Sequence, residues 1–469
     1  MSRTARVARP PGPGAVATLR QLVDREVPAT DVLSAIARDY PRIAHLRLAG
    51  EHVYFLHHPD PVRELFVGQG RFTVKGRALQ RSKALLGEGL LTSEGELWRR
   101  QRRLVQPAFH ADRMRAYVDQ MVASAGEHAR SRWADGQQID LASDMAALTL
   151  TIVGEALFGS DLRAEATEVA DALAEMVGQF RRRVIPGTQV LDRLPLPSNR
   201  RGAGAIDRLD AVVGRLMAQR QAAADAGAGH PTGGRGSTGA VGDDVLSVLL
   251  ATGMAHQQVR DEVMTLVLAG HETTANAMTW AWYLLSRNAP VAAALRAELD
   301  AVLGGAPGRA VTVGDLGSLP YTTAVVAETL RLFPPAWAMG RRVLSEVVVD
   351  GWTLPSGSLA IASQYVLHRD PGSWADPQSF VPGRWLDAAG GFDQAAPGQP
   401  RGAWFPFGLG QRVCVGEPFA WAESVVLLAT LSRAWLVEVD PDYRAVVQPA
   451  VTLRPRGPVP ATVRRASRF

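Results

Sequence analysis

The stretch Phe407-Gly408-Leu409-Gly410-Gln411-Arg412-Val413-Cys414-Val415-Gly416 carries the single cysteine of this 469-residue chain. A lone thiol cannot form an intrachain disulfide, and the commoner role of such a residue is that of a small buried hydrophobic side chain. The three glycines favour a different role, because they let the main chain wrap closely around the sulfur and point N–H groups at it.

The residues after the cysteine strengthen this interpretation. Residues 417–429 predict an apolar helix, so Cys414 would lie just before a helix N-terminus, whose partial positive charge favours a thiolate. No partner base lies nearby in the sequence, and the pattern therefore favours a metal ligand over a nucleophile.

The spacing Phe-x-x-Gly-x-Arg-x-Cys-x-Gly resembles the haem-binding loop of cytochrome P-450 monooxygenases, with no departure from it. The resemblance implies haem b (iron protoporphyrin IX) with Cys414 as its iron ligand and Arg412 at a propionate. It implies that Phe407 shields the sulfur, and that Gly408 and Gly416 let the backbone come close. A thiolate ligand pushes electron density onto iron and favours O–O cleavage.

Composition bounds the class of protein. The chain is 46% hydrophobic with a net charge of +5, which supports a large core and a basic face toward an acidic partner. No Lys/Arg block flanked by aromatic residues occurs, so nucleic acid is not expected as a partner. Residues 1–16 are rich in Pro, Gly, Ala and Arg and are predicted to be a disordered segment. They also lack the apolar core of a signal peptide. A single cysteine fits a reducing cytosol, and no stretch approaches the roughly 20 apolar residues of a membrane span. We therefore expect a cytoplasmic protein.

The N-terminal quarter alternates helix and strand patterns. Residues 17–40 predict a helix, residues 43–48 and 52–56 a hairpin around a glycine, and Pro59 the start of the next helix. Residues 67–90 predict an irregular basic segment, which the resemblance places over the substrate pocket.

Trp98 and Arg102 lie four residues apart on one face of a helix predicted over residues 94–104. They match the family's Trp-x-x-x-Arg, whose members bond a haem propionate, and a guanidinium suits a carboxylate because it can bind both oxygens. Arg99 and Arg103 form either a solvated basic face or a docking surface for an acidic electron carrier.

Residues 140–222 predict mostly helix, broken at 185–187 and at 194–199. The resemblance implies a lid over the active site here. Residues 227–242 are a low-complexity segment and predict a flexible surface loop. They do not mark a domain boundary, so residues 17–469 are expected to form one domain.

A long apolar helix over residues 256–286 contains Ala269-Gly270-His271-Glu272-Thr273-Thr274. Gly270 costs about 1 kcal/mol relative to alanine in a helix interior, and threonines that bond back to carbonyls bend a helix. These residues predict a polar notch beside a flat ligand, with a solvent-facing Glu272 and a merely packed Thr273 as the alternative. The segment matches the family's Ala-Gly-x-Glu-Thr.

The resemblance assigns roles to this segment. It implies that Glu272 and Thr273 deliver protons to dioxygen, that Ala269 and Gly270 contact the haem, and that Leu266 and Ala269 line the substrate pocket. The family does not fix the position of His271, which is expected to be a packing or surface residue.

Glu328 and Arg331 are spaced for an ion pair on a helix, which is usually exposed and contributes a few tenths of a kcal/mol. With Arg384 they match the family's Glu-x-x-Arg and Pro-x-Arg elements, and the resemblance implies a structural brace beneath the haem loop.

The C-terminal third predicts short strands at 347–349 and 359–361 and a strand pair in 445–456. The resemblance implies a second propionate-binding arginine, Arg341 or Arg342, with the register favouring Arg341. It also implies pocket-lining residues, which are expected to be Ala336, Trp337, Ala338 and Thr452.

The sequence therefore predicts a mainly α fold with a smaller β-rich region, the α+β cytochrome P-450 fold. We expect a monooxygenase that takes electrons from a separate ferredoxin or flavodoxin, with NAD(P)H used through a reductase. It would use dioxygen to hydroxylate or epoxidise a lipophilic small molecule such as a terpenoid, fatty acid or other secondary metabolite. The alternatives are a haem-thiolate peroxygenase, isomerase or dehydratase, and a non-catalytic haem-binding protein.

Overall fold

The computed structural model describes residues 8–14, 24, 26–48, 50–162, 165, 168–169, 171–172, 175, 194, 196–225, 244–304, 309–395 and 400–466. Several predicted features lie wholly or largely outside these residues: the disordered segment 1–16, residues 17–23 of the first helix, the break at 185–187 and the loop 227–242.

The α-helices of the described residues are α2 (Ala29–Asp39), α3 (Pro59–Arg63), α4 (Arg77–Leu86), α5 (Gly95–Val105), α6 (Ala111–Arg132), α7 (Leu141–Phe158), α10 (Pro197–Asp225), α11 (Val245–Ala251), α12 (His256–Arg287), α13 (Ala289–Leu303), α14 (Pro320–Leu332), α15 (Gln364–Leu367) and α16 (Glu417–Ser432). The strands are β1 (Ile43–Leu48), β2 (Glu51–Leu56), β3 (Thr73–Lys75), β4 (Gln137–Asp140), β5 (Met339–Val343), β6 (Val347–Val349), β7 (Trp352–Leu354), β8 (Leu359–Ala362), β9 (Trp435–Val439), β10 (Val447–Pro449), β11 (Leu453–Pro455) and β12 (Pro460–Arg465).

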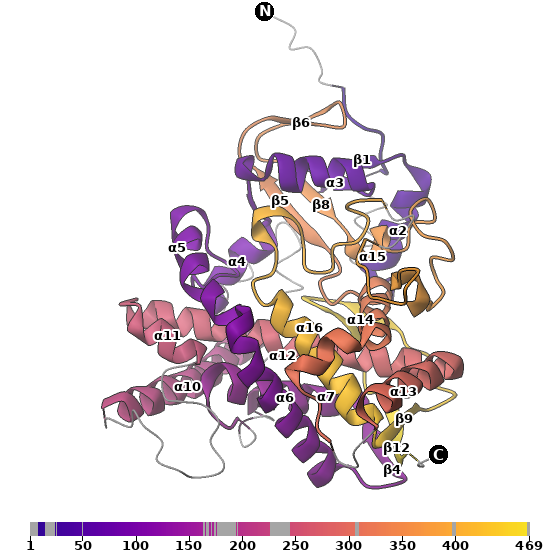
Figure 1. Cartoon of the computed structure of the whole chain (residues 1–469). Coiled ribbons are helices and arrows are strands. Elements are labelled where there is room, and N and C mark those ends of the chain that lie inside the picture. The colour runs from indigo at the N-terminus through magenta and orange to yellow at the C-terminus, as the bar shows by residue number, and fades with distance from the viewer. Residues whose placement is uncertain are drawn as a thin grey trace, which may run out of the picture.

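The largest sheet lies at one end of the molecule with α2, α3 and α15, and the longer helices form the rest (Figure 1). Its strand order is β1-β2-β8-β5-β3. The hairpin β1–β2 is antiparallel as predicted, and Gly50 at φ 86° lies in its turn. The mainly helical fold with a smaller β-rich region is confirmed.

Helices α7 and α12 form the centre of the helical region. The 18 residues of α7 have a mean hydropathy of 1.5, which makes it the one helix in the described ranges that is apolar and long enough to cross a membrane. However, 67% of this helix is buried inside the protein. Thr149 of α7 donates a hydrogen bond to the carbonyl of His271 in α12 at 3.1 Å, so α7 is a core helix.

Three sequence predictions need correction. In the helix predicted over residues 17–40, residues 24 and 26–28 are not helical, because α2 begins at Ala29 after the extended Pro28. Residues 67–90 are not irregular, because they contain β3 and the 10-residue helix α4. The basic side chains of α4 hid a helix that ends at Gly87, whose φ is 68°. The break at 194–199 is shorter than predicted, because α10 begins at Pro197 and proline is tolerated in the first turn of a helix.

Candidate functional site

The cysteine loop is a tight turn that ends at the start of α16. The amide of Cys414 donates a hydrogen bond to the carbonyl of Phe407 at 2.9 Å. Gly408 and Gly410 have φ values of 84° and 70°, which side chains rarely adopt, so both positions require glycine. Gly416 was expected to be needed for the same reason, but its φ is −87° and a Cβ there would lie 4.0 Å from the sulfur of Cys414. In the described structure its glycine identity is therefore not explained by backbone strain or crowding.

The thiol of Cys414 is accessible, so a ligand can reach the sulfur. Enough protein surrounds it that burial raises the pKa of the thiol, whereas the backbone N–H groups of Gly416 and Glu417 and the charge of Arg102 oppose that shift. A bound metal ion supplies the further positive charge that deprotonates a coordinating thiol.

A group of cations lies beside this loop. Arg412 stacks 3.7 Å above the ring of Trp98 and forms an ion pair with Glu94. Arg102, on the same helix as Trp98, donates a hydrogen bond to the carbonyl of Val413. The structure thus brings together three predicted site residues from two distant segments.

Arg341 is the third arginine of this group. It is 9% exposed and lies over the ring of Phe66, whereas Arg342 is exposed. Within the described parts of the chain, no carboxylate lies at ion-pair distance from Arg341, although Glu94 acts on it electrostatically. Burying an unpaired charge is costly, and this donor set therefore fits an anionic group such as a pair of haem propionates.

Two further residues beside these arginines, Lys75 and Glu94, were not predicted as site residues from the sequence. Lys75 is buried, and its ammonium donates to the carbonyls of Leu90 and Ser93 at 2.8 and 2.9 Å. Burial, followed by the charge of Arg412, lowers the pKa of Lys75 to about 7. Glu94, which pairs with Arg412, also accepts the amide N–H of Lys75 at 2.6 Å. The only sequence signal for Lys75 was its place in a segment expected to be irregular.

On α12, Ala269 and Thr273 occupy one face. Ala269 is exposed although Val267 and His271 are buried, so the described parts of the chain leave this face of a core helix uncovered. The hydroxyl of Thr273 donates to the carbonyl of Ala269 at 2.6 Å. These two residues therefore line one accessible face of the helix.

The other predicted residues of this segment point elsewhere. Gly270 faces α7, where a Cβ would meet Val153 at 2.8 Å, so helix packing accounts for this glycine. His271 is buried as a packing residue.

Glu272 faces the hairpin formed by β10 and β11. Its carboxylate accepts a hydrogen bond from the hydroxyl of Thr452 at 2.5 Å. Burial raises the pKa of Glu272, and the Thr452 bond and the charge of Arg454 oppose that shift. The alternative of a solvent-facing Glu272 is therefore wrong, and Thr452, expected in the substrate pocket, lies against the acid.

The carboxylate of Glu328 is fully buried and is bound by Arg331 and Arg384. Arg331 donates to both oxygens of Glu328 at 2.8 Å, and Arg384 donates at 3.1 Å. Trp385, which the sequence analysis missed, also donates at 2.9 Å. Glu328 and Arg331 are therefore not the exposed ion pair that this spacing usually forms. His368 connects this cluster to the cysteine loop, because its carbonyl accepts from Arg331 and its ring accepts from the amide of Phe405.

The predicted pocket residues come from three segments: α12, residues 336–338, and the turn between β10 and β11 that holds Thr452. Leu266 is buried in α12 at 6% exposure, whereas Ala336 is exposed and Trp337 and Ala338 are half-buried. The indole of Trp337 donates to the carbonyl of Ala450 at 3.0 Å. Their contact with a substrate stays a prediction.

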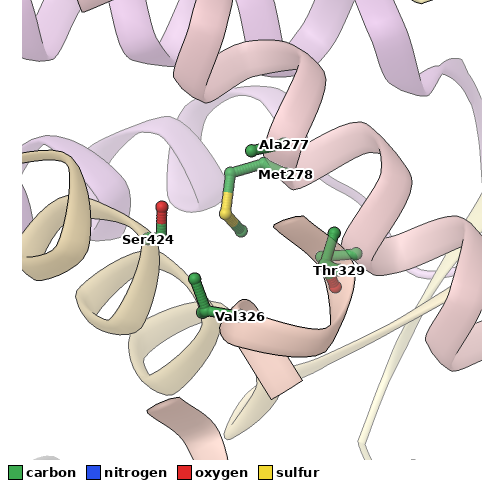
Figure 2. Close-up of a pocket in the computed structure, with 6 residues that line it drawn as sticks. Ala277, Met278, Val326, Thr329 and Ser424 are labelled. Carbon is green, nitrogen blue, oxygen red and sulfur yellow. The ribbon is translucent and has the colours of Figure 1, made fainter. Parts of the chain in front are cut away.

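A separate gap lies between α12, α14 and α16, where Met278 faces Val326 and Ser424 (Figure 2). It contains none of the predicted site residues, and no water-sized sphere fits in it. It is a packing defect of the core rather than a ligand site.

Comparisons with known proteins identify the family of this chain. A family profile described as cytochrome P-450 matches residues 10–456. The cyclooctatin synthase of Streptomyces melanosporofaciens is 39% identical over 419 residues, covering 88% of this chain and 86% of that protein. The cyclooctat-9-en-7-ol 5-monooxygenase of the same organism is 33% identical, with 85% and 83% covered.

A third relative and a solved structure extend the comparison. The pentalenene oxygenase of Streptomyces avermitilis is 31% identical, with 85% of each chain covered. The crystal structure of a cytochrome P-450 haem domain matches with a TM-score of 0.82, covers 98% of both chains and is 24% identical, which supports the fold alone.

Proposed function

Because this chain belongs to the cytochrome P-450 family of haem-thiolate monooxygenases, we propose that it hydroxylates or epoxidises a terpenoid. The observation that carries the family chemistry is the accessible thiol of Cys414 with Arg102 close to it, and the buried Arg341 close to Arg412 of the same loop. The terpenoid class rests on the names of three relatives, among them a pentalenene oxygenase and a cyclooctat-9-en-7-ol monooxygenase.

Haem would be held at both its metal and its rim. Cys414 would bind the iron, and Arg341, Arg412, Trp98 and Arg102 would bind the propionates. When bound, haem supplies dioxygen activation and oxygen transfer. Arg412 must exchange part of its pairing with Glu94 for a propionate, and Trp98 fixes the plane of the guanidinium.

The face of α12 would hold and move protons. Thr273 bonds Ala269 in the resting protein, and rotation of its hydroxyl would let it donate a proton beside a ligand. Glu272 is the preceding residue of the same helix, but its carboxylate faces Thr452. It would take up a proton and turn from Thr452 to pass that proton toward Thr273. The exposed Ala269 would leave room for the substrate.

Electrons would come from a separate ferredoxin or flavodoxin, with a reductase that oxidises NAD(P)H. The exposed arginines of α5, including Arg99 and Arg103, give a basic surface near the cysteine loop for an acidic carrier. We expect the protein to act in the cytoplasm, where such carriers are reduced.

The test is turnover against a matched set of substrates. The haem-loaded protein is supplied with a bacterial ferredoxin, its reductase, NADPH and dioxygen. It is then offered cyclic terpenes, terpene alcohols and fatty acids of similar size. We expect products with one added oxygen from terpenoids and little from fatty acids. Equal or better turnover of fatty acids would contradict the substrate class, and turnover with peroxide alone but none with the reductase would indicate a peroxygenase.

A further inference from the structure

The turn between β10 and β11 holds a side chain that reaches across the fold to α12. Thr452 is 5% exposed and donates its hydroxyl hydrogen to the carboxylate of Glu272, 180 positions earlier in the chain, at 2.5 Å. A hydrogen bond to a carboxylate is among the stronger ones in proteins.

A second residue of α12 determines the direction of this bond. The side-chain amide of Asn276 donates to the hydroxyl oxygen of Thr452 at 3.1 Å. Because an amide N–H₂ group only donates, it occupies a lone pair of Thr452 and leaves the one hydroxyl hydrogen for Glu272. Asn276 follows Glu272 by four residues, so Thr452 bridges successive turns of the same helix face.

The hairpin itself is tied in place on both sides of Thr452. The amide of Leu453 donates to the carbonyl of Pro335 at 2.9 Å, and the indole of Trp280 donates to the carbonyl of Leu453 at 3.1 Å. The amide of Ala450 donates to the carbonyl of Thr452 at 3.0 Å. With the backbone held at these points, the hydroxyl stays within reach of the carboxylate.

We propose that Thr452 is a positioning residue for Glu272: together with Asn276 it fixes the rotamer of the carboxylate and favours its ionised form. The inference rests on the proposed proton role of Glu272, but its geometry does not. Thr452 acts through Glu272: its hydroxyl bonds Glu272 and Asn276, whereas Thr273 bonds the carbonyl of Ala269.

The charge environment of Glu272 agrees with this assignment. Burial raises the pKa of Glu272, while the Thr452 bond and then the charge of Arg454 on β11 lower it. His271, its neighbour on α12, is buried at the α7 contact. Thr452 is thus the largest opposing influence, and its removal should make the carboxylate harder to ionise.

The test measures Glu272 directly in the resting haem-loaded protein. A pH titration followed by difference infrared spectroscopy detects carboxyl groups, and the signal of Glu272 is identified by its loss in Glu272→Gln. Thr452→Val removes the hydroxyl and keeps the branched shape. We expect its titration midpoint to rise by roughly one to two pH units, and Thr452→Ser, which keeps the hydroxyl, to restore the wild-type midpoint.

Two outcomes would overturn the proposal. One is an unchanged titration midpoint in Thr452→Val. The other is a midpoint in Thr452→Ser that rises as much as in Thr452→Val, because serine keeps the hydroxyl and the hydroxyl would then not be the cause. If Thr452→Val does not fold, Asn276→Leu provides the second variant. It frees the hydroxyl to turn away, so the midpoint should rise by a smaller amount, and no rise would again contradict the proposal.

A second measurement separates this proposal from the function on which it rests. The peroxide released per NADPH consumed should rise in Glu272→Gln if Glu272 takes part in proton delivery. Unchanged peroxide release in Glu272→Gln would remove that role, while the infrared shift in Thr452→Val would still establish the positioning. If the infrared midpoint does not shift in Thr452→Val but peroxide release rises in Glu272→Gln, the proton role of Glu272 stands and the positioning role of Thr452 is refuted.

Discussion

Replacement of Glu328 by glutamine tests the buried cluster that supports the cysteine loop. The carboxylate accepts from Arg331 twice at 2.8 Å, from Arg384 at 3.1 Å, from Trp385 at 2.9 Å and from the amide of Val381 at 2.9 Å. Glutamine has the same shape but only one acceptor oxygen and no charge, so it would leave the guanidinium of Arg331 unpaired at 0% exposure.

Breaking a buried ion pair by removal of one partner costs about 3 to 5 kcal/mol. Since a folded domain is stable by only about 5 to 15 kcal/mol, Glu328→Gln should lose a large part of its free energy of unfolding. Urea denaturation followed by tryptophan emission measures this loss, and Trp385 and Trp374 lie beside the cluster as reporters.

Glu127→Gln is the matched control. Glu127 and Arg130 of α6 have the same i, i+3 spacing and a distance of 2.8 Å, but their side chains are 47% and 71% exposed. Removing such a pair changes stability by only a few tenths of a kcal/mol. If Glu328→Gln were no less stable than Glu127→Gln, the structural role of the buried cluster would be refuted.

Three further predictions concern protons, electrons and pH. Thr273→Ala should retain haem but release more peroxide per NADPH than Thr273→Ser, and equal release would contradict the proton role. Arg103→Glu should slow reduction by ferredoxin in stopped-flow measurements at low salt, and an unchanged rate would remove Arg103 from the docking surface. Burial raises the pKa of Glu423 from 4.5 to about 8, so the folded state holds its proton longer than the unfolded state. The free energy of unfolding should therefore fall as pH rises between these two values. In Glu423→Gln it should fall less over the same range. An equal fall in both proteins would contradict the raised pKa of Glu423.

Local patterns in the sequence predicted most of the fold. The apolar periodicity of 256–286 became α12, and the glycine between two alternating runs became the turn of β1–β2. The prediction for residues 67–90 was wrong because the basic residues and glycines of this segment hid the helix α4. Five of its ten residues are apolar, and Ala, Leu, Arg, Lys and Gln all favour a helix.

The sequence predicted those site residues that belong to the family's motifs. It did not predict the contacts between segments that are far apart in the chain. Cys414, Arg412 and Trp98 lie together as their motifs imply. The pairing of Glu94 with Arg412 and the bond from Thr452 to Glu272 join segments 318 and 180 positions apart. No local spacing encodes such contacts, since they arise only when the sheet and the helices have packed.

The proposed function depends most on Cys414 as the thiolate ligand of haem. The most direct measurement is the absorption spectrum of the reduced protein with carbon monoxide, compared between wild type and Cys414→Ser at equal haem content. We predict the band typical of thiolate ligation in the wild type and its loss in Cys414→Ser. The same band in both proteins would contradict the assignment.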